Sequence, residues 1–277
     1  MSVILVWHVT KSNTEQVELE DASSLDAITR QLPDGYYSTF RTFDGGTRVL
    51  GLIAHLRRLY DPVSAPEVDE LSLRSELHSL LAPYRPGEAR VRAVMTREAQ
   101  VYIALAPLTP LPREIYEKGV RVETAELQRQ HPHLKSTSFI GRSDAERKHI
   151  AQEGIFEALL VKERHILEGM TSNFFYVGQA ANLPYVGTAA DDILLGITRE
   201  TVIDIARGME LEVKYEPLKR DRLATVSEAF ITSSSRGVVP VIQIDNVTIG
   251  QGSPGPVTKT LAAAYDAYVL ANAEKIV

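Results

Sequence analysis

Lys135 has the surroundings that best suit a nucleophilic amine in this sequence. Nine of the 30 basic residues are lysines, and six of these have an acidic residue within three positions, as solvated lysines usually do: Lys118, Lys148, Lys162, Lys214, Lys219 and Lys275. Lys135 lies in the segment HLKSTSF at 133–139, which contains no acidic residue. Burial without a fixed anion lowers the pKa of a lysine and keeps its amine nucleophilic, as Schiff-base chemistry requires. Lys135 is therefore a candidate catalytic amine.

Glu168 is the candidate carboxylate. It ends a short apolar segment just before a run of small residues, in ILEGMTSNFF at 166–175. A buried carboxylate at that place could hold the proton on a ring nitrogen of a ligand. A carboxylate that caps a turn would have the same sequence context, so the pattern leaves both interpretations open.

Two segments have residue types that suit an anion such as phosphate. In HLRRL at 55–59, His55 and Arg58 are three residues apart on one helix face, and the planar fork of arginine matches phosphate oxygens. In LLGITR at 194–199, Gly196 and Thr198 lie where a helix begins, and helix N-termini present free amides to anions. A solvated helix face and an ordinary helix start remain alternative interpretations.

A third segment, ITSSSRG at 231–237, contains the hydroxyl cluster Ser233, Ser234 and Ser235 directly after an expected strand. Hydroxyl groups at a strand end can line an anion pocket, and the same composition is common in loops. The segment His131-Pro132-His133 lacks nearby carboxylates, which favours a loop over a metal site. We expect no metal.

The composition excludes several classes of chemistry. The 277 residues include no cysteine, so disulfides, thiolate metal sites and thiol nucleophiles are excluded. A formal charge of -6 argues against an overall nucleic-acid footprint, and no apolar stretch approaches membrane-spanning length. The run at 1–10 has no basic start and no small-residue cleavage site, so we expect a strand there rather than a signal peptide. These features favour a soluble, cytoplasmic, globular protein.

Hydrophobic periodicity and turn residues predict the elements that must position these groups. The expected strands are 35–43, 47–50, 89–96, 101–106, 119–126, 156–161, 166–168, 174–177, 229–232 and 238–244, and the expected helices are 52–60, 69–81, 145–152, 197–209 and 257–270. On helix 69–81 we expect an apolar side of Leu71, Leu73, Leu77, Leu80 and Leu81. The segment APLTPLPR at 106–113 has three prolines and is the best linker candidate. This pattern predicts an α+β protein of two domains.

The ordered set of features resembles the class IV (fold type IV) pyridoxal-phosphate enzymes. This family includes branched-chain and D-amino acid aminotransferases, (R)-amine transaminases and aminodeoxychorismate lyase. The likeness extends over about 35–268 and depends on the order of HLRRL at 55–59, the lysine, EGIFEALLV at 153–161, LEGMTSNFF at 167–175, LLGITR at 194–199, and SEAFITSSS at 227–235 with PVIQID at 240–245.

The resemblance implies a role for each candidate. Lys135 would form the internal aldimine with pyridoxal 5'-phosphate (PLP) and move the proton, and Glu168 would pair with the pyridinium nitrogen. His55 would support Arg58. The implied phosphate and cofactor contacts are Arg58, Gly196, the amides of Ile197 and Thr198, the Thr198 hydroxyl, Ser233 and Ser234.

The resemblance also implies the architecture. A small N-terminal α/β sandwich domain at 1–107 and a linker at 108–116 would precede a larger PLP-binding domain at 117–277 with a barrel-like β core. The cofactor would lie between the domains, and a homodimer would complete the active sites.

Departures from the family pattern bear on the substrate. Branched-chain enzymes usually have a tyrosine five residues after the lysine, where this chain has Ile140. The loop at 97–100 is too short for the arginine–histidine trap of the D-amino acid type. Arg92, Tyr37 and Ser235 are the remaining candidates for the substrate.

The function that the resemblance implies is a ping-pong transfer of an amino group from an amino acid or primary amine to a 2-oxo acid. The sequence leaves open whether the donor is an L-amino acid, a D-amino acid or an (R)-amine. The stretch at 38–41 keeps aminodeoxychorismate lyase, which releases pyruvate, as an alternative. A non-catalytic PLP-binding homologue is a third interpretation.

Overall fold

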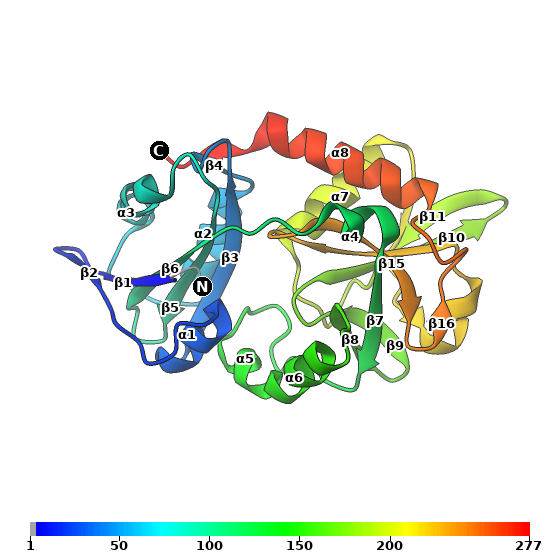
Figure 1. Cartoon of the computed structure of the whole chain (residues 1–277), viewed down its shortest axis with the longest axis horizontal. Helices are drawn as coiled ribbons and strands as arrows, with labels where there is room; N and C mark the ends of the chain where they lie inside the picture. The colour runs from blue at the N-terminus through cyan, green and yellow to red at the C-terminus, as the bar shows by residue number, and fades with distance from the viewer. Residues whose placement is uncertain (1–3) are drawn as a thin grey trace. The chain divides into compact units, whose positions relative to one another are not determined.

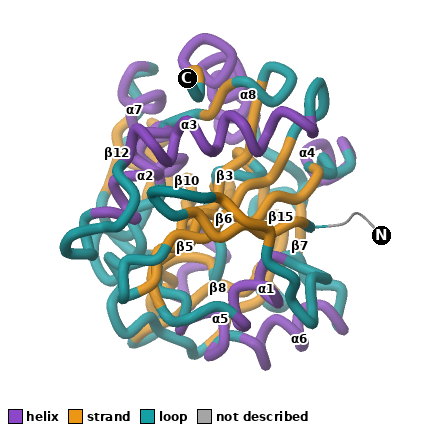
Figure 2. Tube along the Cα trace, turned by 90° about the vertical axis from the view of Figure 1, so that its left-hand side faces the viewer, coloured by secondary structure: helices purple, strands orange, loops and turns teal. Residues whose placement is uncertain are grey.

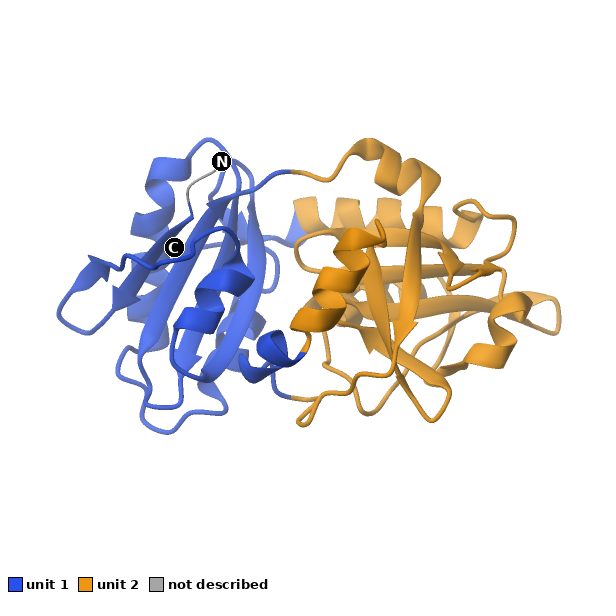
Figure 3. Cartoon of the chain, turned by 60° about the horizontal axis from the view of Figure 1, so that its bottom comes forward, with its two compact units in different colours: residues 1–109, 134–142, 271–277 blue, residues 110–133, 143–270 orange. Residues whose placement is uncertain are grey.

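The computed structural model describes residues 4–277 and divides into two compact units. Unit 1 comprises Met1–Thr109, Leu134–Arg142 and Ala271–Val277, and unit 2 comprises Pro110–His133 and Ser143–Leu270 (Figure 3). The expected linker at 108–116 includes the first passage between the units. Of the region 117–277, the segments 134–142 and 271–277 belong to unit 1. Residues 1–3 of the expected N-terminal strand lie outside the described residues.

Unit 1 is built on one antiparallel sheet of seven strands (Figure 1). In spatial order these are β17 (Glu274–Lys275), β4 (Arg48–Val49), β3 (Gly35–Phe43), β5 (Ala89–Thr96), β6 (Val101–Pro107), β1 (Leu5–Val9) and β2 (Thr14–Gln16). The hairpin that joins β3 to β4 turns at Gly45 and Gly46, whose φ angles of 66° and 81° favour glycine. The long central strands match the expected ones because their aromatic and β-branched residues suit a pleated surface.

Helices cover both faces of this sheet (Figure 2). On one face, α2 (Leu52–Tyr60) and α3 (Glu70–Leu81) bury their leucines against β3, β5 and β6 in a continuous core. On the other face, α1 (Leu25–Gln31) and α5 (Ser138–Arg142) pack against alternate residues of the same strands. A short 3-10 turn, η1 (Ala82–Tyr84), follows α3.

One residue of α3 departs from the expected apolar side. Leu73, Leu77 and Leu81 are buried with a spacing of four, whereas Leu71 is 78% exposed. Leu71 lies two residues from Leu73, which places it about 200° around the helix from that leucine and therefore toward solvent. The prediction that Leu71 belongs to the apolar side was wrong, whereas the predicted burial of Leu73, Leu77 and Leu81 is confirmed.

Unit 2 contains a closed six-strand barrel. Its strands follow the ring order β10 (Asn173–Ala180), β14 (Glu228–Ser233), β15 (Gly237–Ile244), β7 (Val120–Ala125), β8 (Glu157–Lys162) and β9 (His165–Gly169). The pairing of Glu168 on β9 with Asn173 on β10 closes the ring. Apolar side chains from all six strands fill one core, among them Val122, Leu159, Ile166, Phe174, Ile231 and Val239. The expected α+β fold with a barrel-like core in the larger part is confirmed.

The remaining elements extend and cover this barrel. Short strands add to the sheet: β11 (Leu183–Gly187), β12 (Glu212–Lys214), β13 (Leu218–Lys219) and β16 (Val247–Thr248). The helical elements are α4 (Arg113–Lys118), α6 (Asp144–Gln152), α7 (Ile197–Gly208), α8 (Pro256–Asn272) and the 3-10 segment η2 (Arg220–Thr225). Within residues 4–277, no helix has the length and apolar character needed to cross a membrane.

The burial pattern of α3 predicts unequal effects of two leucine substitutions. Leu77→Ala removes a side chain that is 1% exposed and should lower the free energy of unfolding by roughly 2–5 kcal/mol. Leu71→Ala, on the same helix, should change it by less than about 0.5 kcal/mol. Urea denaturation of both variants measures the difference, and equal losses would contradict the assignment of the buried face.

Candidate functional site

The candidate site residues form one group in each unit. Unit 1 contains Tyr37, Arg58, Arg92 and Lys135, and unit 2 contains Glu168, Gly196, Ile197, Thr198, Ser233, Ser234 and Ser235.

Backbone pairing holds the Lys135 segment on the first residues of β3. The Lys135 carbonyl accepts a hydrogen bond from the Tyr37 amide at 2.9 Å, and the Thr137 amide donates to the Gly35 carbonyl at 2.9 Å. The Thr137 hydroxyl also accepts from the Gly35 amide at 2.9 Å. A Cβ at Gly35 would lie 2.1 Å from the Met95 carbonyl, so β3 and β5 require a glycine there. These bonds explain why this lysine segment belongs to unit 1.

His55 is a buried neutral group beside the cations of unit 1. It is 1% exposed, and its Nδ1 lies 2.7 Å from the hydroxyl of Ser38. Burial, followed by the charges of Arg58 and Lys135, lowers the pKa of His55 well below its ordinary value of 6.5. The buried Nε2 of His55 has no hydrogen-bond partner among the described residues. His55 thus lies close enough to Arg58 and Lys135 for both charges to act on it.

Tyr37 lies between two cations in the same unit. The Lys135 Nζ is 4.9 Å from the centre of the Tyr37 ring, and the Arg92 guanidinium carbon is 4.7 Å from it. Arg92 is buried rather than at a solvated sheet face, and its Nη1 pairs with Asp26 at 2.6 Å. Its Nε donates to the Thr39 hydroxyl at 3.0 Å. The arginine therefore holds the tyrosine ring while its charge is balanced by Asp26.

Glu168 is a buried carboxylate with a buried cationic partner. Its side chain is 2% exposed, and Oε1 accepts from Arg129 Nε at 2.8 Å, where the arginine side chain is 3% exposed. Its Oε2 accepts from the Leu194 amide at 3.2 Å. Arg129 also donates to the Met170 carbonyl at 2.9 Å. These partners favour the ionised carboxylate.

Asn173 connects Glu168 to the start of α7. It pairs with Glu168 across the barrel closure and with Thr232 on β14, so the three residues lie in one row at one end of the barrel. Its Nδ2 donates to the Leu194 carbonyl at 2.7 Å. A Cβ at Gly196 would lie 2.1 Å from the Asn173 Oδ1, so only glycine fits there. Asn173 therefore fixes the backbone that leads into the helix.

The N-terminus of α7 has the donors of an anion site. No side chain caps its first turn, so its first amides remain outside intrahelical and capping bonds. The Thr198 hydroxyl lies 3.4 Å from the Ser234 hydroxyl, which brings the helix start and the serine segment together. Both hydroxyls and the positive end of the helix suit a phosphate group.

The sequence analysis missed Arg129 and Asn173. Arg129 lies in the polar stretch LQRQH, which looks like a solvated loop, and the one available signal is its position six residues before Lys135. Asn173 lies in the motif LEGMTSNFF, and no role was predicted for it. In the part of the chain from 4 to 277, no group of three or more His, Cys, Asp or Glu residues could hold a metal ion.

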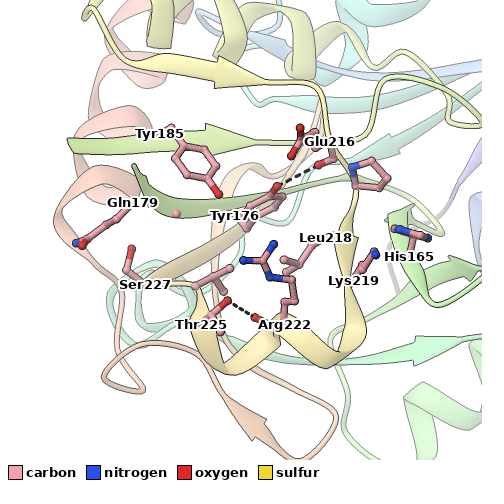
Figure 4. Close-up of a pocket in the computed structure, with 13 residues that line it drawn as sticks. His165, Tyr176, Gln179, Tyr185, Glu216, Leu218, Lys219, Arg222, Thr225 and Ser227 are labelled. Carbon is pink, nitrogen blue, oxygen red and sulfur yellow. Dashed lines mark hydrogen bonds between the residues drawn. The ribbon is translucent and has the colours of Figure 1, made fainter. Parts of the chain in front are cut away.

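A cavity of about 680 Å³ lies elsewhere in unit 2 (Figure 4). Its wall includes Tyr176, Gly178 and Tyr185, and burial raises the pKa of Tyr176 to about 12. Gly178 is five residues along β10 from Asn173, or about 17 Å at the usual strand rise. None of the candidate site residues lines this cavity. It is therefore separate from the row that contains Glu168.

The donor set fits PLP. A lysine amine in unit 1 suits the aldehyde of that cofactor, and in unit 2 a buried, ion-paired carboxylate and an uncapped helix start with two hydroxyls suit its ring nitrogen and phosphate. The closed barrel of unit 2 and the seven-stranded sheet of unit 1 agree with the architecture expected for PLP enzymes of fold type IV.

Comparisons with known proteins identify the family. A family model for the amino-transferase class IV family matches residues 35–244, so the chain belongs to this PLP-dependent family and is an enzyme of the transaminase class. The D-alanine aminotransferase of Bacillus licheniformis is 30% identical over 295 residues, covering 100% of both chains. The branched-chain-amino-acid aminotransferase of Pseudomonas aeruginosa is 25% identical over 288 residues, covering 94% of this chain and 91% of that one.

A solved structure has the same fold. The branched-chain aminotransferase of the thermophilic archaeon Thermoproteus uzoniensis, crystallised with norvaline, superposes with a TM-score of 0.77 at 22% identity, covering 100% of each chain. The expected family and the expected enzyme class are confirmed.

The pKa of His55 predicts a loss of stability on the acid side. Above about pH 6.5 His55 is neutral in both the folded and the unfolded chain, whereas below it only the unfolded chain gains the proton. Stability should therefore fall as the pH falls, by up to about 1.4 kcal/mol per pH unit from this residue. Urea denaturation of wild type and His55→Gln between pH 7.5 and 5 should show a flatter profile for the variant. An unchanged slope would contradict the assignment, and His131→Gln, at an exposed histidine, is the control.

The ion pair of Glu168 predicts strong coupling with Arg129. Arg129→Leu leaves a buried carboxylate without its cation and should lower the free energy of unfolding by roughly 3–5 kcal/mol. The double variant Arg129→Leu/Glu168→Leu should recover a large part of that loss. Arg113→Leu, which removes the exposed pair with Glu117, should cost less than about 1 kcal/mol in the same urea titration. Additive losses in the double variant would show that the two buried side chains do not interact.

Proposed function

We propose that this protein is a PLP-dependent aminotransferase that moves an amino group from an amino acid or primary amine to a 2-oxo acid in a ping-pong cycle. The observation that carries the proposal is the buried, Arg129-paired Glu168, because an ionised carboxylate of this kind suits a protonated ring nitrogen. When bound, PLP supplies an aldehyde that condenses with primary amines and a ring that withdraws electrons from the substrate carbon.

Each candidate residue then has a definite task. The Lys135 amine would hold the aldehyde carbon and carry a proton at its Nζ, and the neutral His55 would add no further positive charge beside it. The Glu168 carboxylate would keep the proton on the ring nitrogen. Gly196 with the amides of Ile197 and Thr198 at the α7 start would bind the phosphate. Arg58 and the hydroxyls of Thr198, Ser233 and Ser234 would complete that phosphate site.

Three residues are proposed for the substrate side of the site. We assign Tyr37, Arg92 and Ser235 to the substrate, with Arg92 acting through the Tyr37 ring because its guanidinium is already paired with Asp26. The named relatives include D-alanine and branched-chain-amino-acid aminotransferases, which supports an amino acid as the donor. A D-amino acid, an L-amino acid and a primary amine are the three donor classes to compare. A homodimer and a cytoplasmic location complete the proposal.

The direct test is Lys135→Ala in the purified protein. The wild type incubated with PLP should show a visible absorption band that disappears when an amino donor is added and returns with a 2-oxo acid. Lys135→Ala should lose that band and slow the half-reaction by roughly 10²–10⁴-fold or more, because it lacks the proton carrier. Lys259→Ala, at an exposed lysine of α8, is the matched control.

Three results would contradict the proposal. An unchanged band and turnover in Lys135→Ala would remove the lysine from the chemistry. Pyruvate release from aminodeoxychorismate without an acceptor would favour the lyase, and absence of any PLP band in the wild type would favour a non-catalytic homologue. A half-reaction screen with L-amino acids, D-amino acids and amines then identifies the donor.

A further inference from the structure

Glu157 is a second buried carboxylate in unit 2. It is the first residue of β8 and is 2% exposed. Its Oε2 accepts from the hydroxyl of Thr171 at 2.5 Å and from the hydroxyl of Ser172 at 3.2 Å. Thr171 and Ser172 belong to the turn that directly follows Glu168 and Gly169 on β9. The Glu157 carboxylate therefore binds the turn next to Glu168, the proposed partner of the ring nitrogen.

Arg236 neutralises Glu157 and contacts the same turn. Its Nη2 lies 2.9 Å from Glu157 Oε2 and donates to the Thr171 hydroxyl at 2.6 Å. Its Nε donates to the Ser233 hydroxyl at 3.0 Å, and its guanidinium carbon lies 5.2 Å from the centre of the Phe156 ring. One guanidinium thus bonds three side chains from three different segments.

The same residue closes the serine turn between β14 and β15. The Arg236 amide donates to the Ser233 carbonyl at 3.2 Å, and the Tyr116 hydroxyl donates to the Arg236 carbonyl at 2.9 Å. This leaves Ser234 and Ser235 at the tip of a four-residue turn. The backbone and the side chain of Arg236 therefore both fix the turn that contains the proposed phosphate hydroxyls.

We propose that Arg236 is a positioning residue that fixes the serine turn at 233–236 relative to the turn at 170–172, which follows Glu168 in the chain. Through it, the phosphate-binding hydroxyls and the ring-nitrogen carboxylate keep a constant separation, which a rigid cofactor requires. This inference rests on the proposed function. An apolar pair of the same volume could fill the space with no desolvation penalty, but it would supply none of the three directed bonds to Glu157, Thr171 and Ser233.

The test compares PLP binding in four purified apo-proteins: wild type, Arg236→Met, Arg236→Lys and Arg164→Gln. Equilibrium titration followed by absorbance gives the Kd for PLP without any turnover. Arg236→Met should weaken PLP binding by about tenfold or more, the change expected for losing one or more charge-assisted hydrogen bonds. Arg236→Lys keeps the charge but not the fork, so its Kd should lie between those of wild type and Arg236→Met.

Arg164→Gln is the matched control, because it removes an exposed arginine pair, that with Asp221, from the same unit. Its Kd should stay within about twofold of the wild-type value. Glu157→Gln, which keeps the shape of the side chain and removes the charge, supplies a second route if Arg236→Met does not fold. It should also weaken PLP binding.

The outcomes separate the inference from the function on which it rests. A wild type that binds PLP and transaminates, with Arg236→Met or Glu157→Gln equal to it in Kd, overturns the positioning role and leaves the aminotransferase intact. Variants that melt at a lower temperature but bind PLP with the wild-type Kd give a merely structural role and also overturn it. A wild type that binds no PLP contradicts the proposed function itself.

Discussion

The ion pair of Glu168 with Arg129 governs how the barrel of unit 2 can close. The ring closes where Glu168 on β9 pairs with Asn173 on β10, so a carboxylate lies at the seam and away from water. A buried charge without a partner is strongly unfavourable, and Arg129, itself 3% exposed, supplies the partner. The same arginine bonds the Met170 carbonyl, so it also holds the turn after β9. The proposed ring-nitrogen carboxylate thus lies at the seam of the barrel.

The other reactive groups are held by backbone as much as by side chains. In unit 1, backbone bonds to Gly35 and Tyr37 fix the Lys135 segment along β3. In unit 2, Asn173 fixes the backbone before α7, and its Oδ1 lies where a side chain at position 196 would begin. Rigid main chain can hold such groups in place without restricting the side chains that must move.

The elements with a strong hydrophobic period could be predicted from the sequence. The bounds of β3, β5 and α2 are those expected, because each has a clear repeat bounded by turn residues. Strand β11 was not expected, since Pro184 and Gly187 in LPYVG argue against a strand. It forms through its pairing with β10 on one side and β12 on the other. Leu71 was assigned to the wrong side of α3 because the prediction grouped the leucines together. Its position two residues before the buried Leu73 places it on the opposite side of the helix.

In the candidate site, too, the residues with a local sequence signal could be predicted and those that depend on long-range contacts could not. Lys135 and Glu168 could be proposed from the sequence because an acid-free lysine context and a lone acid at the end of an apolar strand are local signals. Arg129 could not, because its partner lies 39 residues away and its neighbours are polar. The inclusion of 134–142 in unit 1 depends on bonds to residues about 100 positions earlier, which no local pattern encodes.

The ¹⁵N chemical shift of the ring nitrogen of labelled PLP bound to the protein tests the role of Glu168 directly. We expect a protonated nitrogen in the wild type, because Arg129 keeps Glu168 ionised, and an unprotonated nitrogen in Glu168→Gln at the same pH. An unprotonated nitrogen in the wild type, or the same shift in both proteins, would contradict the claim that Glu168 holds that proton.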